Sequence, residues 1–149
     1  MWRIKAGGRW AAVIVSAMAW AGCSMADAAR TPAPPAGAER VADWSVFDQA
    51  RADQLRRGLT ELDRRLPAGE SLETQLWRLP ATASWASLRS HYDQQAGWQA
   101  DPRRQASAGP LTPDAQVYID PSGATMLTIA YFGAAPDAVL VVQRARVAR

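Results

Sequence analysis

Three runs of β-branched and aromatic residues in the last third of the chain restrict the fold more than any other feature. They cover residues 116–119, 125–132 and 138–146, and such residues favour strands. Between the first two runs, the sequence Asp-Pro-Ser-Gly at 120–123 matches the preferences of a type I turn. A second short turn is expected at 134–137. Short connections of this kind predict consecutive antiparallel strands.

The alternation of side chains predicts which residues of these strands share a face. One face should carry Val117, Ile119, Leu127, Ile129 and Tyr131. The opposite face of the middle strand, Met126 to Phe132 at every second position, is too apolar to be fully wetted, so a helix or a partner should cover it. Residues 139–142 are apolar at every position, which predicts a last strand that is central or covered on both sides.

Two helices and a further strand are predicted upstream. Residues 43–66 form a helix with Asp43 as its cap and with leucines at helical spacing on one face: Leu55, Leu59, Leu62 and Leu66. Pro67 prevents the helix from continuing through the next turn. Residues 72–79 favour a strand that Pro80 closes.

The second helix begins at Thr82 or Ser84, either of which can cap it, and its apolar face carries Trp85, Leu88, Tyr92 and Ala96. Gly97 occupies the position of a left-handed C-terminal cap. A short strand at 98–100 and a loop at 101–115 complete the pattern. The sequence therefore predicts an α+β domain in the order α-β-α-β-β-β-β, with a small antiparallel sheet of four to five strands packed with two helices.

The first 22 residues have the layout of a secretory signal. They carry Arg3, Lys5 and Arg9 and no acid, and residues 10–22 are then uncharged. Crossing the hydrocarbon of a bilayer needs about 20 helical residues, and this apolar stretch has thirteen. The segment therefore predicts export.

The export segment ends in Trp20-Ala21-Gly22-Cys23, which resembles the lipobox of bacterial lipoproteins. The resemblance covers only the first two dozen residues, and Trp20 stands where that class usually has Leu, Val or Ile. It implies cleavage before Cys23, the only cysteine, with diacylglycerol on its thiol and an acyl chain such as palmitate on its new amine. Ser24 after the cysteine implies an outer-membrane destination, with the domain facing the periplasm.

Two other readings of this segment remain open. Ala26-Asp27-Ala28 can serve as an A-x-A cleavage site, which would discard Cys23 and release a soluble periplasmic or secreted protein. The segment can also stay uncleaved as an anchor. Residues 23–40 are rich in Ala and Pro and should form a tether, because they contain too little apolar surface to fold alone. The remaining residues, 41–149, suffice for one single-core domain.

Removal of the signal changes the charge of the protein. The whole chain has 17 basic and 14 acidic residues, and the signal contains three basic residues and no acid. The mature protein is therefore balanced, and it lacks the basic footprint of a nucleic-acid binder. We expect no nucleic-acid partner.

No motif indicates catalysis, a cofactor or a metal. His91 is the only histidine, and its neighbours on a helix point in different directions, so a half-exposed structural role is expected. Asp114, Asp120 and Asp137 lie in predicted loops without the spacing of a calcium site. The sequence also contains no G-x-S-x-G motif. We expect a non-enzymatic protein.

The tryptophans are numerous for so small a domain, and most should fill the core. Some could instead line a groove for a partner. The candidate partner-binding residues are Trp77, Tyr118, Met126 and Phe132. We expect an envelope lipoprotein that acts as an interaction or assembly-accessory module with a protein partner. The alternative is a binding protein for a small amphiphile or glycan, which uses the aromatic sheet face or a pocket under the long loop.

Overall fold

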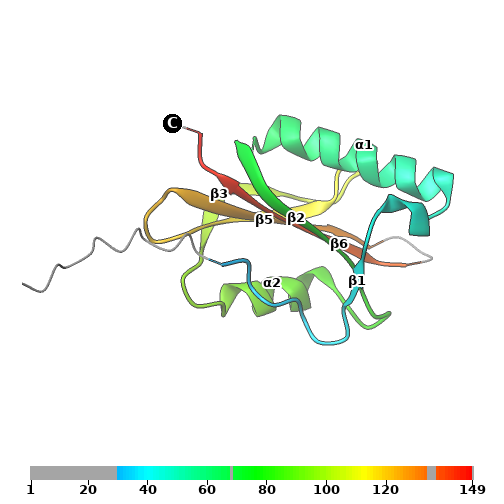
Figure 1. Cartoon of the computed structure of the whole chain (residues 1–149), viewed down its shortest axis with the longest axis horizontal. Coiled ribbons are helices and arrows are strands. Elements are labelled where there is room, and N and C mark those ends of the chain that lie inside the picture. The colour runs from blue at the N-terminus through cyan, green and yellow to red at the C-terminus, as the bar shows by residue number, and fades with distance from the viewer. Residues whose placement is uncertain (1–29, 68, 134–136, 149) are drawn as a thin grey trace, which may run out of the picture.

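A computed structural model describes residues 30–67, 69–133 and 137–148. Helix α1 (Gln49–Arg65) lies on one face of an antiparallel sheet and helix α2 (Trp85–Asp93) on the other (Figure 1). The α+β class and the two helices are as predicted. The sheet has six strands, where the sequence indicated four to five.

The strand order across the sheet is β1-β2-β6-β5-β4-β3, and all neighbours are antiparallel. The bounds are β1 (Glu39–Val41), β2 (Glu70–Arg78), β3 (Gln99–Ala106), β4 (Asp114–Ile119), β5 (Thr125–Phe132) and β6 (Val139–Arg146). Strand β6 lies between β2 and β5, which confirms that the last apolar run is central. Its first four residues are all buried.

The differences from the prediction concern the two edge strands. Residues 39–41 pair with β2, although 39 and 40 were predicted to end the tether. A strand of three residues shows no detectable alternation. Residues 101–106 were predicted as part of a proline-containing loop at 101–115, but they continue β3 across an irregularity between Ala100 and Gln105. Proline and charges are tolerated there because the outer side of an edge strand needs no partner.

Helix α1 begins later than predicted. The Asp48 carboxylate accepts the backbone N–H of Arg51 at 2.8 Å and caps α1, while Asp43 caps a preceding 3₁₀ helix, η1 (Trp44–Val46). The predicted leucine face is confirmed, since Leu55 and Leu62 are buried and Leu59 and Leu66 pack at the margin of the core. The chain thus turns once through η1 before α1 starts.

Helix α2 has one of the two predicted caps and most of the predicted inner face, but Ala96 was wrongly placed on that face, because it lies beyond the helix end and is exposed. Ser84 and Ser87 form a reciprocal capping box. Leu88 and Tyr92 are fully buried against the sheet, and Trp85 packs beside them. The helix ends at Asp93, and Gly97 takes a φ of 82° in the turn that follows.

The hairpin between β4 and β5 corrects the predicted faces. It pairs Ile119 with Met126 and Val117 with Thr128, so Val117 and Ile119 share a face with Met126 and not with Leu127. Because an even number of residues lies between the paired positions 119 and 126, each odd-numbered residue of β4 pairs with an even-numbered residue of β5. A change of one residue in register moves every side chain to the other face.

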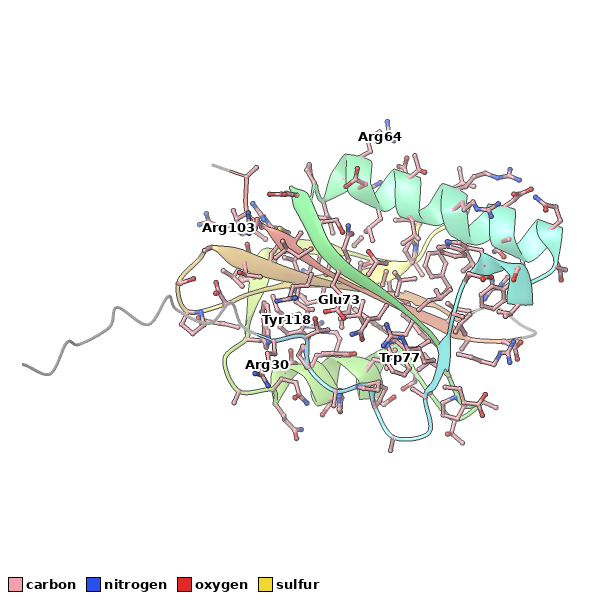
Figure 2. The ribbon with its side chains drawn as sticks, in the orientation of Figure 1. Arg30, Arg64, Glu73, Trp77, Arg103 and Tyr118 are labelled. Carbon is pink, nitrogen blue, oxygen red and sulfur yellow. The ribbon has the colours of Figure 1, made fainter. Side chains whose placement is uncertain are left out.

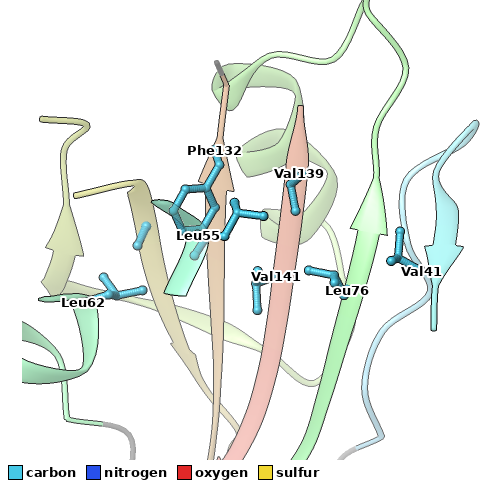
Figure 3. Close-up of a cluster of buried hydrophobic side chains, with 9 residues drawn as sticks. Val41, Leu55, Leu62, Leu76, Phe132, Val139 and Val141 are labelled. Carbon is cyan, nitrogen blue, oxygen red and sulfur yellow. The ribbon is translucent and has the colours of Figure 1, made fainter. Parts of the chain in front are cut away.

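The two faces of the sheet carry two cores. Under α1 the buried cluster is Val41, Leu55, Leu62, Leu76, Ala115, Ala130, Phe132, Val139 and Val141 (Figure 3). Under α2 the buried cluster is Leu79, Leu88, Tyr92, Trp98, Tyr118, Leu127, Ile129, Leu140 and Val142. The apolar face of β5 that needed a cover is therefore covered by α1.

Residues 30–38, which we call the strap, lie against the α2 side of the domain (Figure 1). Three hydrogen bonds hold the strap: Trp98 Nε1 donates to the Arg30 carbonyl (3.3 Å), Thr31 Oγ1 donates to Glu73 Oε2 (2.5 Å), and His91 Nε2 contacts the Ala33 carbonyl (2.9 Å). The Thr31 bond is the first cause that lowers the pKa of Glu73, followed by the bond from Gln75. The segment predicted as the distal half of a tether is thus attached to the domain.

Candidate functional site

Three of the four candidate partner-binding residues are core residues. Tyr118 and Met126 are 0% and 1% exposed, and Phe132 is 8% exposed. Met126 and Phe132 lie on the face that α1 covers, and Tyr118 lies under α2 with its hydroxyl donating to Asp93 Oδ1 at 2.9 Å. Because both faces are covered by helices, the aromatic sheet face is not open to a ligand. Cys23 lies outside the described residues.

Trp77 keeps part of its surface exposed (Figure 2). It lies on β2, its Nε1 donates to Gln75 Oε1 at 3.2 Å, and the Arg40 guanidinium lies 5.9 Å from its ring centroid. Arg40 belongs to β1, the strand that the sequence did not indicate. A cation over an indole face is a stabilising contact of its own, so Trp77 already has a neighbour in the folded chain.

A pocket of about 430 Å³ lies beneath the long loop before β4. Its walls are residues 108–114 of that loop, residues 131–133 at the end of β5, and three side chains from the first half of α1: Arg51, Gln54 and Arg57. We call it the loop pocket. The sequence indicated a pocket under this loop, but it did not indicate the contribution of α1, because no local pattern relates residues so far apart in the chain.

The loop over the pocket is held by its own hydrogen bonds. Gly109 N donates to the Thr112 carbonyl at 2.8 Å, and Ala108 N donates to Asp114 Oδ1 at 2.9 Å. Thr112 is buried, whereas Leu111 is 63% exposed at the mouth of the pocket. The bonds leave an apolar side chain presented to solvent on a braced loop.

Arg51 forms the inner end of the loop pocket and is 6% exposed. Its Nη1 donates to Gln54 Oε1 at 2.8 Å, and its Nη2 donates to the carbonyls of Asp137 (2.8 Å) and Phe132 (3.4 Å). Burial lowers the pKa of this guanidinium, against the attraction of Asp137 and Asp48, but arginine remains charged in proteins. Arg51 therefore ties α1 to the two ends of the β5–β6 connection.

The rim of the loop pocket carries a second guanidinium. Arg57 is exposed one turn and a half beyond Arg51, and no described carboxylate lies within ion-pair distance of it. The one acid in the lining is Asp114, which accepts the loop bond from Ala108. An unpaired cation beside exposed apolar surface suits a ligand that has an apolar part and an anionic part.

The lining of the loop pocket offers binding groups: guanidinium, amide and apolar side chains around one carboxylate. Within the described ranges, no group of three or more His, Cys, Asp and Glu residues is placed to hold a metal ion. Neither described helix is long and apolar enough to span a membrane.

Comparison with known proteins does not add to this picture. No protein-family model, curated protein or solved structure matches the chain.

Proposed function

We propose that the chain is an envelope lipoprotein, anchored to the outer membrane through lipid on Cys23, whose periplasmic domain is a non-enzymatic interaction module. The lipobox-like residues before Cys23 and the balanced charge of the mature chain support the envelope assignment. The loop pocket supports the binding role. It moves the expected contact surface from the sheet to the junction of α1 and the loop.

The observation that carries the binding role is Leu111 beside Arg57. A single exposed leucine is ordinary on a protein surface, but Leu111 adjoins a concave surface with apolar lining, which is typical of a binding site. Arginine is enriched in such interfaces. An apolar side chain of an envelope protein would enter the loop pocket next to Leu111, and an acidic neighbour would meet Arg57.

Site-specific crosslinking in the producing cell tests this role. A photoreactive residue in place of Leu111 should give a discrete adduct with one envelope protein, and Arg57→Glu should remove that adduct. The matched control is the same photoreactive residue at Ser122, which is also exposed but lies in the β4–β5 turn at the other end of β5. Identical adducts from both positions would show that the loop pocket has no partner of its own.

A small amphiphile or glycan is the second candidate ligand, and the volume of the loop pocket favours it. Pockets for small molecules typically measure about 300–1,000 Å³, and this one is about 430 Å³. Native mass spectrometry of the purified protein would detect a retained molecule of that size. Retention that Arg57→Glu abolishes, together with no crosslinked protein at Leu111, would favour the small ligand.

The anchor has a separate test. Cys23→Ala should block acyl labelling and leave an uncleaved precursor, or shift cleavage to Ala28. Protein of unchanged mature mass that stays in the membrane fraction would contradict lipidation at Cys23.

A further inference from the structure

The strap shortens the distance between the domain and its lipid. Residues 24–40 as a free arm would span roughly 50 Å at about 3.1 Å per residue. The strap begins at Arg30, whose carbonyl is held by Trp98, so only seven residue steps separate it from Cys23. Even a fully extended chain covers at most about 3.6 Å per residue, or roughly 25 Å in total. The part of the domain around Arg30 must therefore stay near the membrane.

One end of the sheet lies around Arg30. Trp98 directly precedes β3, and the first residue of β3 pairs with Ile119, which is followed by the β4–β5 turn. Figure 2 shows Arg30 and Arg103 toward this end. Helix η1 and the start of α1 lie at the opposite end (Figure 1). The short connection thus orients the end with the β4–β5 turn toward the membrane.

A hollow with three arginines lies toward this end, on the α1 side of the sheet. It has a volume of about 260 Å³ between the end of α1 and the irregular part of β3. Its side chains include three cations over apolar neighbours: Arg65, Arg103 and Arg104 with Leu66, Met126 and Val147. None of the described residues that line it is acidic. We call it the basic hollow.

The three guanidinium groups of the basic hollow differ in their partners. Arg65 Nε lies 2.8 Å from Glu61, and Arg104 Nε lies 3.7 Å from Asp101 while its Nη1 lies 3.8 Å from Met126 Sδ. Arg103 is exposed and has no ion pair within the described part of the chain. The two paired acids, Glu61 and Asp101, are not among the residues that line the hollow, so its lining carries positive charge only.

We propose that the basic hollow docks onto anionic phospholipid headgroups of the membrane that holds the lipid of Cys23. This inference rests on the proposed function in taking Cys23 as the anchor. A guanidinium group can donate two parallel hydrogen bonds to the oxygens of one phosphate. Leu66 and Val147, which are partly exposed, offer apolar surface for the glycerol side of the headgroup. A lipid anchor and a basic surface are the two signals that together make membrane attachment stable. Docking would fix the direction in which the loop pocket points.

The experiment uses the full mature protein and two single-cysteine reporters. Ala124→Cys lies beside the β4–β5 turn and Val46→Cys lies in η1, and both positions are exposed. After the native thiol has received its lipid, each introduced thiol is the only one to label with a fluorescent donor. The donor is measured against an acceptor on lipid headgroups in two kinds of vesicle: phosphatidylcholine alone, and phosphatidylcholine mixed equally with phosphatidylglycerol.

The short connection alone should give higher energy transfer from residue 124 than from residue 46 in both kinds of vesicle. Docking of the basic hollow should raise the transfer from residue 124 further, and only in vesicles with phosphatidylglycerol. Arg103→Gln with Arg104→Gln should remove that increase, because each arginine near an anionic surface contributes about 1 kcal/mol, so the docking equilibrium should weaken roughly 30-fold. Added salt should also remove the increase in the unchanged protein. The control variant, Arg40→Gln with Arg56→Gln, removes two positive charges from other parts of the surface. It should leave the energy transfer from both reporters unchanged. Arg103→Gln alone repeats the test without touching an ion pair, in case the double variant folds poorly.

Three results would overturn the docking surface: equal transfer from both reporters, no increase at residue 124 when phosphatidylglycerol is added, or an increase that survives the loss of Arg103 and Arg104. The mass of the same sample shows separately whether Cys23 is acylated. If it is not, the anchor in the proposed function fails, while the protein added to the same vesicles still tests the hollow. Transfer from residue 124 that depends on phosphatidylglycerol would then support docking without the anchor.

Discussion

Gly58→Ala should destabilise the protein, although alanine is the better helix former. Gly58 is buried in the middle of α1, and an added Cβ would lie 2.5 Å from Cε1 and 3.1 Å from Cζ of Phe132. It would also lie 3.5 Å from the Leu111 carbonyl. The ring of Phe132 is packed in the α1 core on one side and lines the loop pocket on the other, so it can move only toward the pocket and with a loss of core contacts.

Two opposing contributions decide how Gly58→Ala changes the free energy of unfolding. Alanine in place of glycine in a helix interior gains about 1 kcal/mol, while overpacking a core costs about 1–3 kcal/mol. The free energy of unfolding of Gly58→Ala should therefore fall by about 0–2 kcal/mol. Displacement of the Phe132 ring should also narrow the loop pocket, so the crosslinking yield at Leu111 should fall.

Urea denaturation with linear extrapolation measures this change, and an unchanged m-value would show that the unfolded state is not involved. In the Phe132→Leu background the clash is absent, so Gly58→Ala should become neutral or stabilising. The coupling energy of that double-mutant cycle should reach about 1–3 kcal/mol. Thr60→Ala on the exposed side of α1 is the control. If Gly58→Ala stabilises the wild-type protein by about 1 kcal/mol, or if the cycle shows no coupling, the packing of α1 against β5 is not as described.

Three other predictions concern the α2 side. Leu88→Ala should lower the free energy of unfolding, measured in a urea melt, by about 2–5 kcal/mol, because Leu88 is 1% exposed. A smaller loss would mean that α2 packs loosely against the sheet. Tyr118→Phe removes a partly buried hydrogen bond to a carboxylate and should lower the free energy of unfolding by about 1.5–3 kcal/mol. Tyr92→Phe should be near neutral, since no described group bonds its hydroxyl, and equal losses from the two changes would contradict this. The pKa of Glu73 is held low, chiefly by the bond from Thr31, so its stabilisation is complete above the ordinary carboxyl pKa and is lost as pH falls through the folded value. Thr31→Val should shrink that acid-dependent loss in urea melts across pH, and an unchanged pH profile would refute the link.

The candidate site was only partly predictable, and Phe132 illustrates why. Its exposure depends on whether α1 or a partner covers its face, and the strand pattern is the same in both cases. A pocket under the long loop was one of two places expected for the alternative small ligand, but the cations of the loop pocket come from α1, about 55 positions earlier in the chain. Side chains so distant in sequence carry no shared local signal.

The amino-acid sequence by itself determined the type and the approximate position of both helices, the turn at 120–123, the central strand β6 and the α+β class. These features depend on periodicity and on local turn and cap chemistry, which act over a few residues. For example, the bonds by which Ser84 caps α2 form within the first turn of the helix, so they do not depend on where the helix packs.

Only the tertiary structure decided the register of the β4–β5 hairpin, the pairing of the three-residue strand β1, the attachment of the strap and the arrangement of the loop pocket and the basic hollow. Each depends on contacts between residues far apart in the chain, or on a turn whose length selects one of two faces. The strap shows the physical reason most clearly. Its sequence cannot fold alone, and it becomes ordered because Glu73, His91 and Trp98 of the folded domain supply its hydrogen bonds.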